Sequence, residues 1–221
     1  MESIKTKFDS KTHGFQFQNQ FDLADFLRID LPFELPFLRQ GNQLGKVVYG
    51  LCGGMCCAAL DYYYAEKNIP DYDDPDEIPY RLFSYLWHRQ MDSLKSPILG
   101  NVITWIMLDD KIVLNQTGKD EIPKLLQELR SGNPSVLILI RSTISSDPTQ
   151  NHQVLATGFD YYEDTRNLII YLYDPNHPKG TTELQIRLSS PGRRLEIRQA
   201  GEITPRGFFV GAYIPQNPVL R

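Results

Sequence analysis

Apolar residues recur along this chain at two different spacings, and the change comes near Pro134. From Cys52 to about Gly132 they recur every three or four residues, which is the spacing of one face of a helix. Four helices are expected in this part, beginning at Cys52, near Pro79, within 97–108 and at Asp120. The pattern therefore predicts that this half of the chain is mainly helical.

After Pro134 the apolar runs become short and rich in β-branched and aromatic residues, which is typical of strands. Six strands are expected, over residues 136–140, 153–159, 168–173, 183–188, 195–198 and 208–214. The connections over 163–167 and 189–192 contain turn-forming residues and are short enough for hairpins, so an antiparallel meander is predicted. Before Cys52 the pattern is less regular, although residues 14–21 alternate like a strand.

The two patterns together predict an α+β fold in which residues 1–221 form a single domain. A helical lobe is expected over about 46–132 and an antiparallel β lobe over about 133–215. The 221 residues include 41% hydrophobic and 23% charged positions, which suits a globular protein with a real core. No Ser/Gly-rich or charge-block linker divides the sequence.

Charge and cysteine content narrow the expected surroundings of the protein. The formal net charge is -4 and the basic residues are scattered, so no nucleic-acid partner is expected. No run approaches the roughly 18 apolar residues of a spanning helix, and no membrane partner is expected. Three cysteines do not suit the paired framework of a secreted scaffold, so reduced thiols and a cytoplasmic location are expected.

Cys52 stands where a glycine-rich turn meets the first expected helix. Gly50, Gly53 and Gly54 surround it, and the helical periodicity starts directly afterwards. At a helix N-terminus, free N–H groups and the helix dipole favour a thiolate over a thiol and can also hold an oxyanion. Cys52 is therefore a candidate nucleophile, but an inert buried cysteine fits the same turn, so a second chemical group is needed to decide between them.

His152 supplies that second group, because it lies where a polar loop enters an apolar strand. An imidazole exchanges protons near neutral pH and can activate a thiol. A further strand, over residues 168–173, ends in Asp174-Pro175-Asn176. A carboxylate at such a strand end can orient the imidazole and stabilise its charged form.

The order of these blocks resembles the papain-like cysteine peptidase superfamily, and it is most similar to the bacteriocin-processing (double-glycine) peptidase domains of peptide exporters. The blocks that carry the resemblance are Cys52-Gly53 at a helix start, then His152-Gln153-Val154 and Thr157-Gly158-Phe159-Asp160, then a strand closing on Asp174-Pro175-Asn176. The resemblance implies a helical lobe packed on an antiparallel sheet. It also implies Cys52 as nucleophile, His152 as general base and later acid, and Asp174 as the orienting residue. Asn176 is the alternative third member, since papain-type enzymes use an amide there.

One position departs from the family pattern. The glutamine that helps to stabilise the oxyanion normally lies about six positions before the cysteine, where this chain has Lys46. Gln43 and Asn42 are the nearest substitutes, and Gln43 is the candidate oxyanion donor. Loss of one such donor typically lowers the rate about a hundred- to a thousandfold.

Three functions stay open for these residues. The leading one is hydrolysis of an amide or peptide bond. The others are transfer of the acyl group to an amine or thiol, as in transglutaminase-like proteins, and non-catalytic binding of a peptide or protein partner.

No cofactor and no metal ion are expected. Cys56 lies one helical turn from Cys52, but no second Cys or His pair completes a zinc site. The acidic stretch 71–77 lacks the glycine and the distal glutamate of an EF-hand loop, so it is interpreted as a solvated connection.

Overall fold

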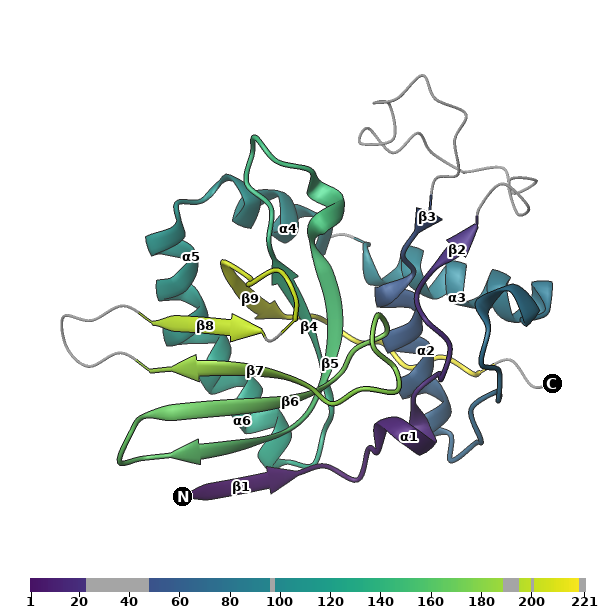
Figure 1. Cartoon of the computed structure of the whole chain (residues 1–221), viewed down its shortest axis with the longest axis horizontal. Coiled ribbons are helices and arrows are strands. Elements are labelled where there is room, and N and C mark those ends of the chain that lie inside the picture. The colour runs from purple at the N-terminus through teal and green to yellow at the C-terminus, as the bar shows by residue number, and fades with distance from the viewer. Residues whose placement is uncertain (23–47, 96–97, 189–194, 200, 219–221) are drawn as a thin grey trace.

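A mixed structure of helices and an antiparallel sheet is formed by the part of the chain that this computed structural model describes, residues 1–22, 48–95, 98–188, 195–199 and 201–218. Within these ranges one sheet has seven strands, in the order β8-β7-β6-β5-β4-β9 with β1 also paired to β5 (Figure 1). Its strands are β1 (Glu2–Lys5), β4 (Ser135–Ile140), β5 (His152–Tyr162), β6 (Asn167–Tyr173), β7 (Thr182–Arg187), β8 (Glu196–Gln199) and β9 (Gly207–Val210). The strands β2 (Phe21–Asp22) and β3 (Val48–Tyr49) pair separately.

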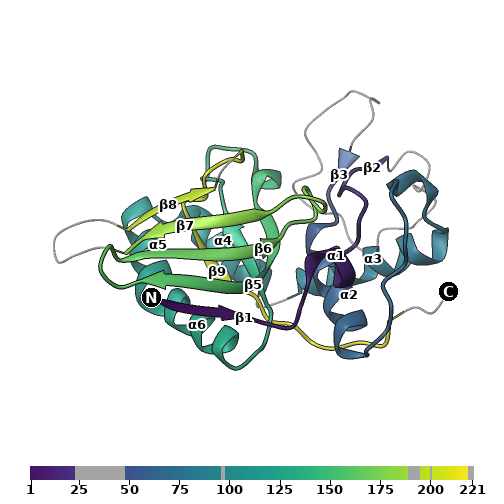
Figure 2. The same cartoon turned by 60° about the horizontal axis from the view of Figure 1, so that its bottom comes forward.

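Six α-helices are assigned within the same ranges. They are α1 (Ser10–His13), α2 (Cys52–Tyr64), α3 (Tyr80–Ser93), α4 (Ile98–Met107), α5 (Asp110–Gln116) and α6 (Ile122–Arg130). A π-helical turn, Thr117–Glu121, joins α5 to α6, and short 3₁₀ turns lie at Pro75–Glu77 and Pro148–Gln150. Figure 2 shows α1, α2 and α3 grouped at one end of the sheet.

The antiparallel meander predicted from the sequence is confirmed for β4 to β8, because each of these strands pairs with the next one along the chain. β9 leaves the meander and returns to pair with β4. It ends at Val210, earlier than the predicted 208–214. The strand-like alternation of residues 14–21 is wrong as a strand assignment, since only Phe21 and Asp22 pair with β3, and Phe15 and Phe17 are instead buried in the core.

Helix α2 is enclosed by its neighbours. Every residue from Gly53 to Tyr62 is buried. The helix contacts α3 and also β5 and β4. Small side chains at Ala58 and Ala59 suit such a position, because they let neighbouring elements approach closely.

The two faces of strand β4 pack against different helices. Val136, Ile138 and Ile140 belong to the core that includes α2 and α3, whereas Leu137 and Leu139 belong to the core that includes α6. Successive side chains of a strand point to opposite faces. The all-apolar sequence of β4 is therefore explained by helices on both faces of the sheet.

Three helices within residues 46–132, the range predicted as a helical lobe, lie against the sheet instead. α4 contacts β4, α5 contacts β9, and α6 contacts β5, β4 and β1; Figure 1 shows the same arrangement. Periodicity identified α4 and α6 because it reports which side chains share a face. It carries no information on which element covers that face, so the division into lobes was wrong at this point.

Strand β5 contains a β-bulge that determines which side chains face its neighbours. Leu155 and Ala156 pair with Tyr173 and Leu172, but Gly158 pairs with Tyr171, so Thr157 is an extra residue. Gly158 permits the close approach of β1, since a Cβ there would lie 2.5 Å from the carbonyl oxygen of Ile4. The bulge switches the alternation of β5 partway along the strand.

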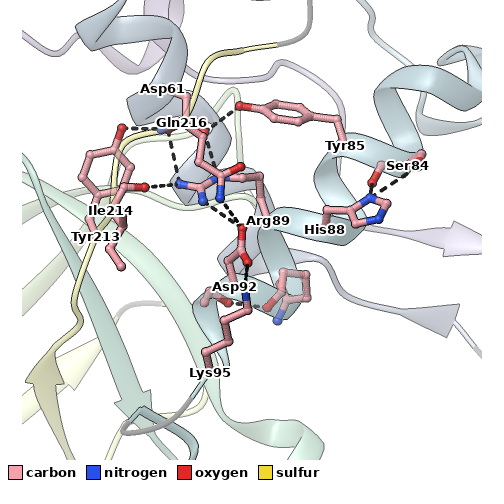
Figure 3. Close-up of polar contacts among 12 residues, drawn as sticks. Asp61, Ser84, Tyr85, His88, Arg89, Asp92, Lys95, Tyr213, Ile214 and Gln216 are labelled. Carbon is pink, nitrogen blue, oxygen red and sulfur yellow. Dashed lines mark hydrogen bonds and ion pairs between the residues drawn. The ribbon is translucent and has the colours of Figure 1, made fainter. Parts of the chain in front are cut away.

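A buried ion pair joins the C-terminal segment to α2 and α3 (Figure 3). Asp61 and Arg89 are each only 1% exposed, and Arg89 Nε lies 2.7 Å from Asp61 Oδ2. Asp61 also accepts hydrogen bonds from the hydroxyl of Tyr85 at 2.6 Å, the hydroxyl of Tyr213 at 2.8 Å and the N–H of Gln216 at 2.9 Å. One carboxylate therefore connects α2, α3 and residues 213–216.

Replacing Asp61 with Ala is expected to lower the free energy of unfolding by about 3–5 kcal/mol, because Arg89 would stay buried without its partner charge. Urea denaturation followed by circular dichroism measures this. Asp71, which is exposed, offers a control, and its replacement with Ala should change stability by less than about 0.5 kcal/mol. Equal small losses in both variants would contradict the structural role assigned to Asp61.

Candidate active site

Cys52 is the first residue of α2, and its sulfur accepts hydrogen bonds from one N–H of the helix start and one N–H of β5. Leu51 is the N-cap residue and makes no side-chain capping bond. The N–H of Gln153 donates to Cys52 Sγ at 3.4 Å, and the N–H of Gly53 also hydrogen-bonds the sulfur. The residue as a whole is partly exposed, although its sulfur is enclosed by neighbouring atoms.

His152 is the first residue of β5 and is 4% exposed. Its Nε2 lies 2.7 Å from Asp174 Oδ1, so the carboxylate holds the proton-bearing Nε2 of the ring. The imidazole also interacts with the side chain of Cys52. With Nε2 committed to Asp174, Nδ1 is the ring atom left to exchange a proton with the thiol.

Asp174 follows directly after β6 and is 1% exposed. Besides His152, its Oδ1 accepts the N–H of Asn176 at 2.9 Å, and its Oδ2 lies 3.4 Å from Gln199 Nε2. Arg141 donates to Gln199 Oε1 at 2.9 Å, which turns the amide nitrogen of Gln199 toward Asp174. Both carboxylate oxygens are therefore held by hydrogen bonds.

These contacts separate the two candidates for the third member of the site. Asp174, and not Asn176, contacts the imidazole of His152. The side chain of Asn176 bonds Asn19 instead, and its contribution to the carboxylate comes from the backbone N–H. Asn176 thus lies beside the site without touching the ring through its amide.

Burial and hydrogen bonding act in opposite directions on the pKa of Cys52. Burial alone would raise the pKa of the thiol, but the hydrogen bond and positive charge of His152, with the N–H groups of Gln153 and Gly53, outweigh it. The net effect is a pKa of Cys52 below its usual value. A lowered pKa increases the share of thiolate at a given pH.

Burial and polar contacts also act in opposite directions on the pKa values of His152 and Asp174. Burial alone would lower the pKa of His152, but hydrogen bonds to Asp174 and Cys52 and their negative charges raise it to about 10. Burial alone would raise the pKa of Asp174, but the hydrogen bond and charge of His152 and the N–H of Asn176 lower it. All three shifts therefore favour the charged forms of the thiol, the imidazole and the carboxyl group.

The pKa values of the other two cysteines are raised, not lowered. Cys56 and Cys57 are buried. Burial raises the pKa of Cys56 well above its usual value and that of Cys57 to about 12. Cys56 donates to the carbonyl of Gln153 at 3.6 Å. Both thiols stay protonated and unreactive at neutral pH.

The remaining sequence candidates lie away from the three central side chains or cannot be placed. Gln43, the candidate oxyanion donor, lies outside the described residues, as do Asn42 and Lys46. His177 is exposed and contacts Glu202 at 2.5 Å, and His88 is exposed on α3 beside Ser84 (Figure 3). Among the residues described, no cluster of three or more His, Cys, Asp or Glu side chains could hold a metal ion.

Two surface hollows lie elsewhere on the molecule. One, of about 300 Å³, is lined by residues of α5, β8 and 204–206. The other, of about 440 Å³, is lined by residues of β1, α1 and the segment after β6. Neither contains Cys52, His152 or Asp174, so the candidate active site is assigned from the geometry of its side chains.

Alkylation of Cys52 by iodoacetamide is expected to reach half its maximal rate at a pH below about 8.5, the pKa of a free cysteine. The sign follows from the lowered pKa of Cys52, since the reactive thiolate is then present at lower pH. In His152→Ala the imidazolium is lost while burial remains, so the midpoint should move to higher pH. Identical profiles for the two proteins would contradict the coupling of Cys52 to His152.

Comparison with known proteins adds no relative from which a role for these residues could be taken. The chain matches no protein-family model and no curated protein, and its fold matches no solved structure. None of the helices within the described ranges is both long enough and apolar enough to cross a membrane. What Cys52 does in this protein must therefore follow from the geometry around its sulfur.

Proposed function

We propose that this protein is a papain-like thiol hydrolase that cleaves an amide or peptide bond through Cys52, His152 and Asp174. The observation that carries the proposal is the row of three side chains at the start of α2. The thiol of Cys52 is coupled electrostatically to an imidazole, and that imidazole is held at 2.7 Å by a buried carboxylate. Nucleophile, base and orienting group are the minimum required for covalent acyl transfer.

The first half of the reaction uses the charged pair. The thiolate of Cys52 attacks the carbonyl carbon, a C–S bond forms, and the carbonyl π electrons move to the oxygen. When this tetrahedral intermediate collapses, the C–N bond breaks and the imidazolium of His152 gives its proton to the leaving amine. The products are a free amine and an acyl group on Cys52.

The second half reverses the roles. Neutral His152 takes a proton from a water molecule, whose oxygen attacks the thioester carbon. The thiolate of Cys52 leaves with the electrons of the C–S bond, and a carboxylic acid is released. Asp174 stays ionised throughout and stabilises the imidazolium each time it forms.

Backbone groups at the start of α2 suit the oxyanion of the intermediate. The N–H of Met55 bonds the carbonyl of Leu51 at 2.8 Å, and the N–H of Gly54 bonds Gln90 Oε1 at 2.8 Å. The N–H of Gly53 bonds the sulfur of Cys52, whereas the N–H of Cys52 has no carbonyl partner within the helix. The N–H of Cys52 can therefore serve as a donor to the oxyanion.

The arrangement of elements gives separate support to a papain-like relationship. A helix that begins with the nucleophile packs against β5, and the base and the carboxylate come from the start of β5 and the end of β6. This placement supports the proposal, because it brings the three side chains together where α2 meets the sheet. A purely non-catalytic binding role is disfavoured, because it would not require Cys52, His152 and Asp174 to be aligned.

An acyl-enzyme test decides whether Cys52 turns over. With 4-nitrophenyl acetate, the wild-type protein is expected to release one equivalent of nitrophenolate in a burst and to carry an acetyl group on Cys52 by mass spectrometry. Cys52→Ala should lose the burst and lower the rate at least about a thousandfold. His152→Ala should slow both acylation and deacylation by about a hundredfold or more.

Cys57→Ala is the matched control, because it removes a thiol of raised pKa from the same helix. It should keep both the burst and the steady-state rate. A wild-type rate in Cys52→Ala would rule out the proposed nucleophile. Adding glycinamide to the reaction separates the two outcomes of the acyl-enzyme, since hydrolysis yields acetate and acyl transfer yields the acetylated amine.

A further inference from the structure

Asn19 joins two segments that are far apart in the sequence. It is 8% exposed and lies between α1 and β2. Its Oδ1 accepts a hydrogen bond from the N–H of Leu51. Its Nδ2 donates to Asn176 Oδ1 at 3.0 Å, and its backbone N–H donates to the carbonyl of Pro175 at 3.0 Å.

Each of these segments carries one side of the candidate active site. Leu51 immediately precedes the nucleophile Cys52 and caps its helix. Pro175 and Asn176 immediately follow Asp174, and the N–H of Asn176 holds Asp174 Oδ1 at 2.9 Å. Asn19 therefore links the residue before the nucleophile to the loop that holds the carboxylate.

An amide is the side chain that these contacts require. Asn19 accepts one hydrogen bond through its oxygen while it donates another through its nitrogen, and only an amide offers both groups in one plane. Gly50 is matched to this arrangement, because a Cβ at that position would lie 2.7 Å from Asn19 Nδ2. The segment before Cys52 is thus shaped around the Asn19 side chain.

We propose that Asn19 and Asn176 form an amide clamp that fixes the distance and angle between the sulfur of Cys52 and the His152 ring. Both are positioning residues, since neither amide contacts the imidazole. The clamp rests on the proposed function, because it matters only if Cys52 is activated by His152. It acts across the junction of a helix and a sheet, where a small displacement would lengthen the hydrogen bond between thiol and imidazole.

The test measures the rate of iodoacetamide alkylation of Cys52 as a function of pH, with adducts assigned by peptide mapping. Asn19→Ala and Asn176→Ala change no charge, and Asn176→Ala keeps the backbone N–H that binds Asp174. Each is expected to slow alkylation at pH 6.5 about tenfold and to move the profile to higher pH. The double variant should be no slower than Asn19→Ala, because both changes break the same connection.

Two further variants separate positioning from stability. Gly50→Ala displaces the Asn19 amide without removing it, so it should shift the profile in the same direction and keeps the test informative if Asn19→Ala fails to fold. Thr117→Val removes the hydrogen bonds of a buried hydroxyl to the backbone of Phe208, at 3.1 and 3.2 Å. It should lower the melting temperature and leave the profile unchanged.

The clamp is overturned if Asn19→Ala and Asn176→Ala melt at lower temperature but alkylate with the wild-type pH profile. It is also overturned if the effects of the two changes are additive, since they would then act separately. Failure of the proposed function gives a different result. In that case wild-type Cys52 is alkylated through an activated thiol and yet forms no acyl-enzyme with 4-nitrophenyl acetate.

Discussion

The single extra residue in β5 is the constraint on which the rest of the site depends. Val154 and Ala156 before the bulge, and Phe159 and Tyr161 after it, face the same core under α6, which unbroken alternation would forbid. If the pairing of Gly158 with Tyr171 continued without a bulge, Asp174 would come level with Leu155, on the face that packs in the core with α2. The bulge moves the carboxylate level with Val154, on the side of β5 that also carries His152. The carbonyl of the extra residue, Thr157, has a partner, because its oxygen accepts a hydrogen bond from the N–H of Thr6 at 2.9 Å.

The structure contains two buried sets of ionisable side chains, one that connects elements of the fold and one that forms the candidate active site. Asp61 accepts hydrogen bonds from two tyrosine hydroxyls and a backbone N–H, and its ion pair with Arg89 joins elements together. Cys52, His152 and Asp174 are also held by contacts with one another and with their neighbours, but Cys52 is partly exposed. A buried charge without partners would be neutralised, so hydrogen bonds to Asp174 are what keep the imidazolium charged. The helix α2 carries both groups, one at its start and one a few turns later.

Sequence patterns predicted the elements and the central residues better than the connections among them. The apolar periodicity gave α3, α4, α6 and the strands β4 to β8, because each buries a regular face. It missed α5 (Asp110–Gln116) and β1 (Glu2–Lys5), which are short. Cys52, His152 and Asp174 were found because thiol, imidazole and carboxylate chemistry is recognisable at helix starts and strand ends. Asn19 and Gln199 were missed because an amide has no distinctive pattern, and its role comes from contacts across 32 and 25 positions of the chain.

The contact between the N–H of Gln153 and the sulfur of Cys52 spans 101 positions of the sequence, and this separation sets an order of events during synthesis. A nascent chain exposes Cys52 long before His152 and Asp174 have been made. Until β5 and β6 dock, the thiol lacks its imidazolium partner and has the modest reactivity of any free cysteine. Contacts between distant positions also form late and slowly in folding. The sulfur of Cys52 therefore gains its partners only when the sheet packs against α2. An activated thiol at Cys52 would then indicate that the chain has finished folding.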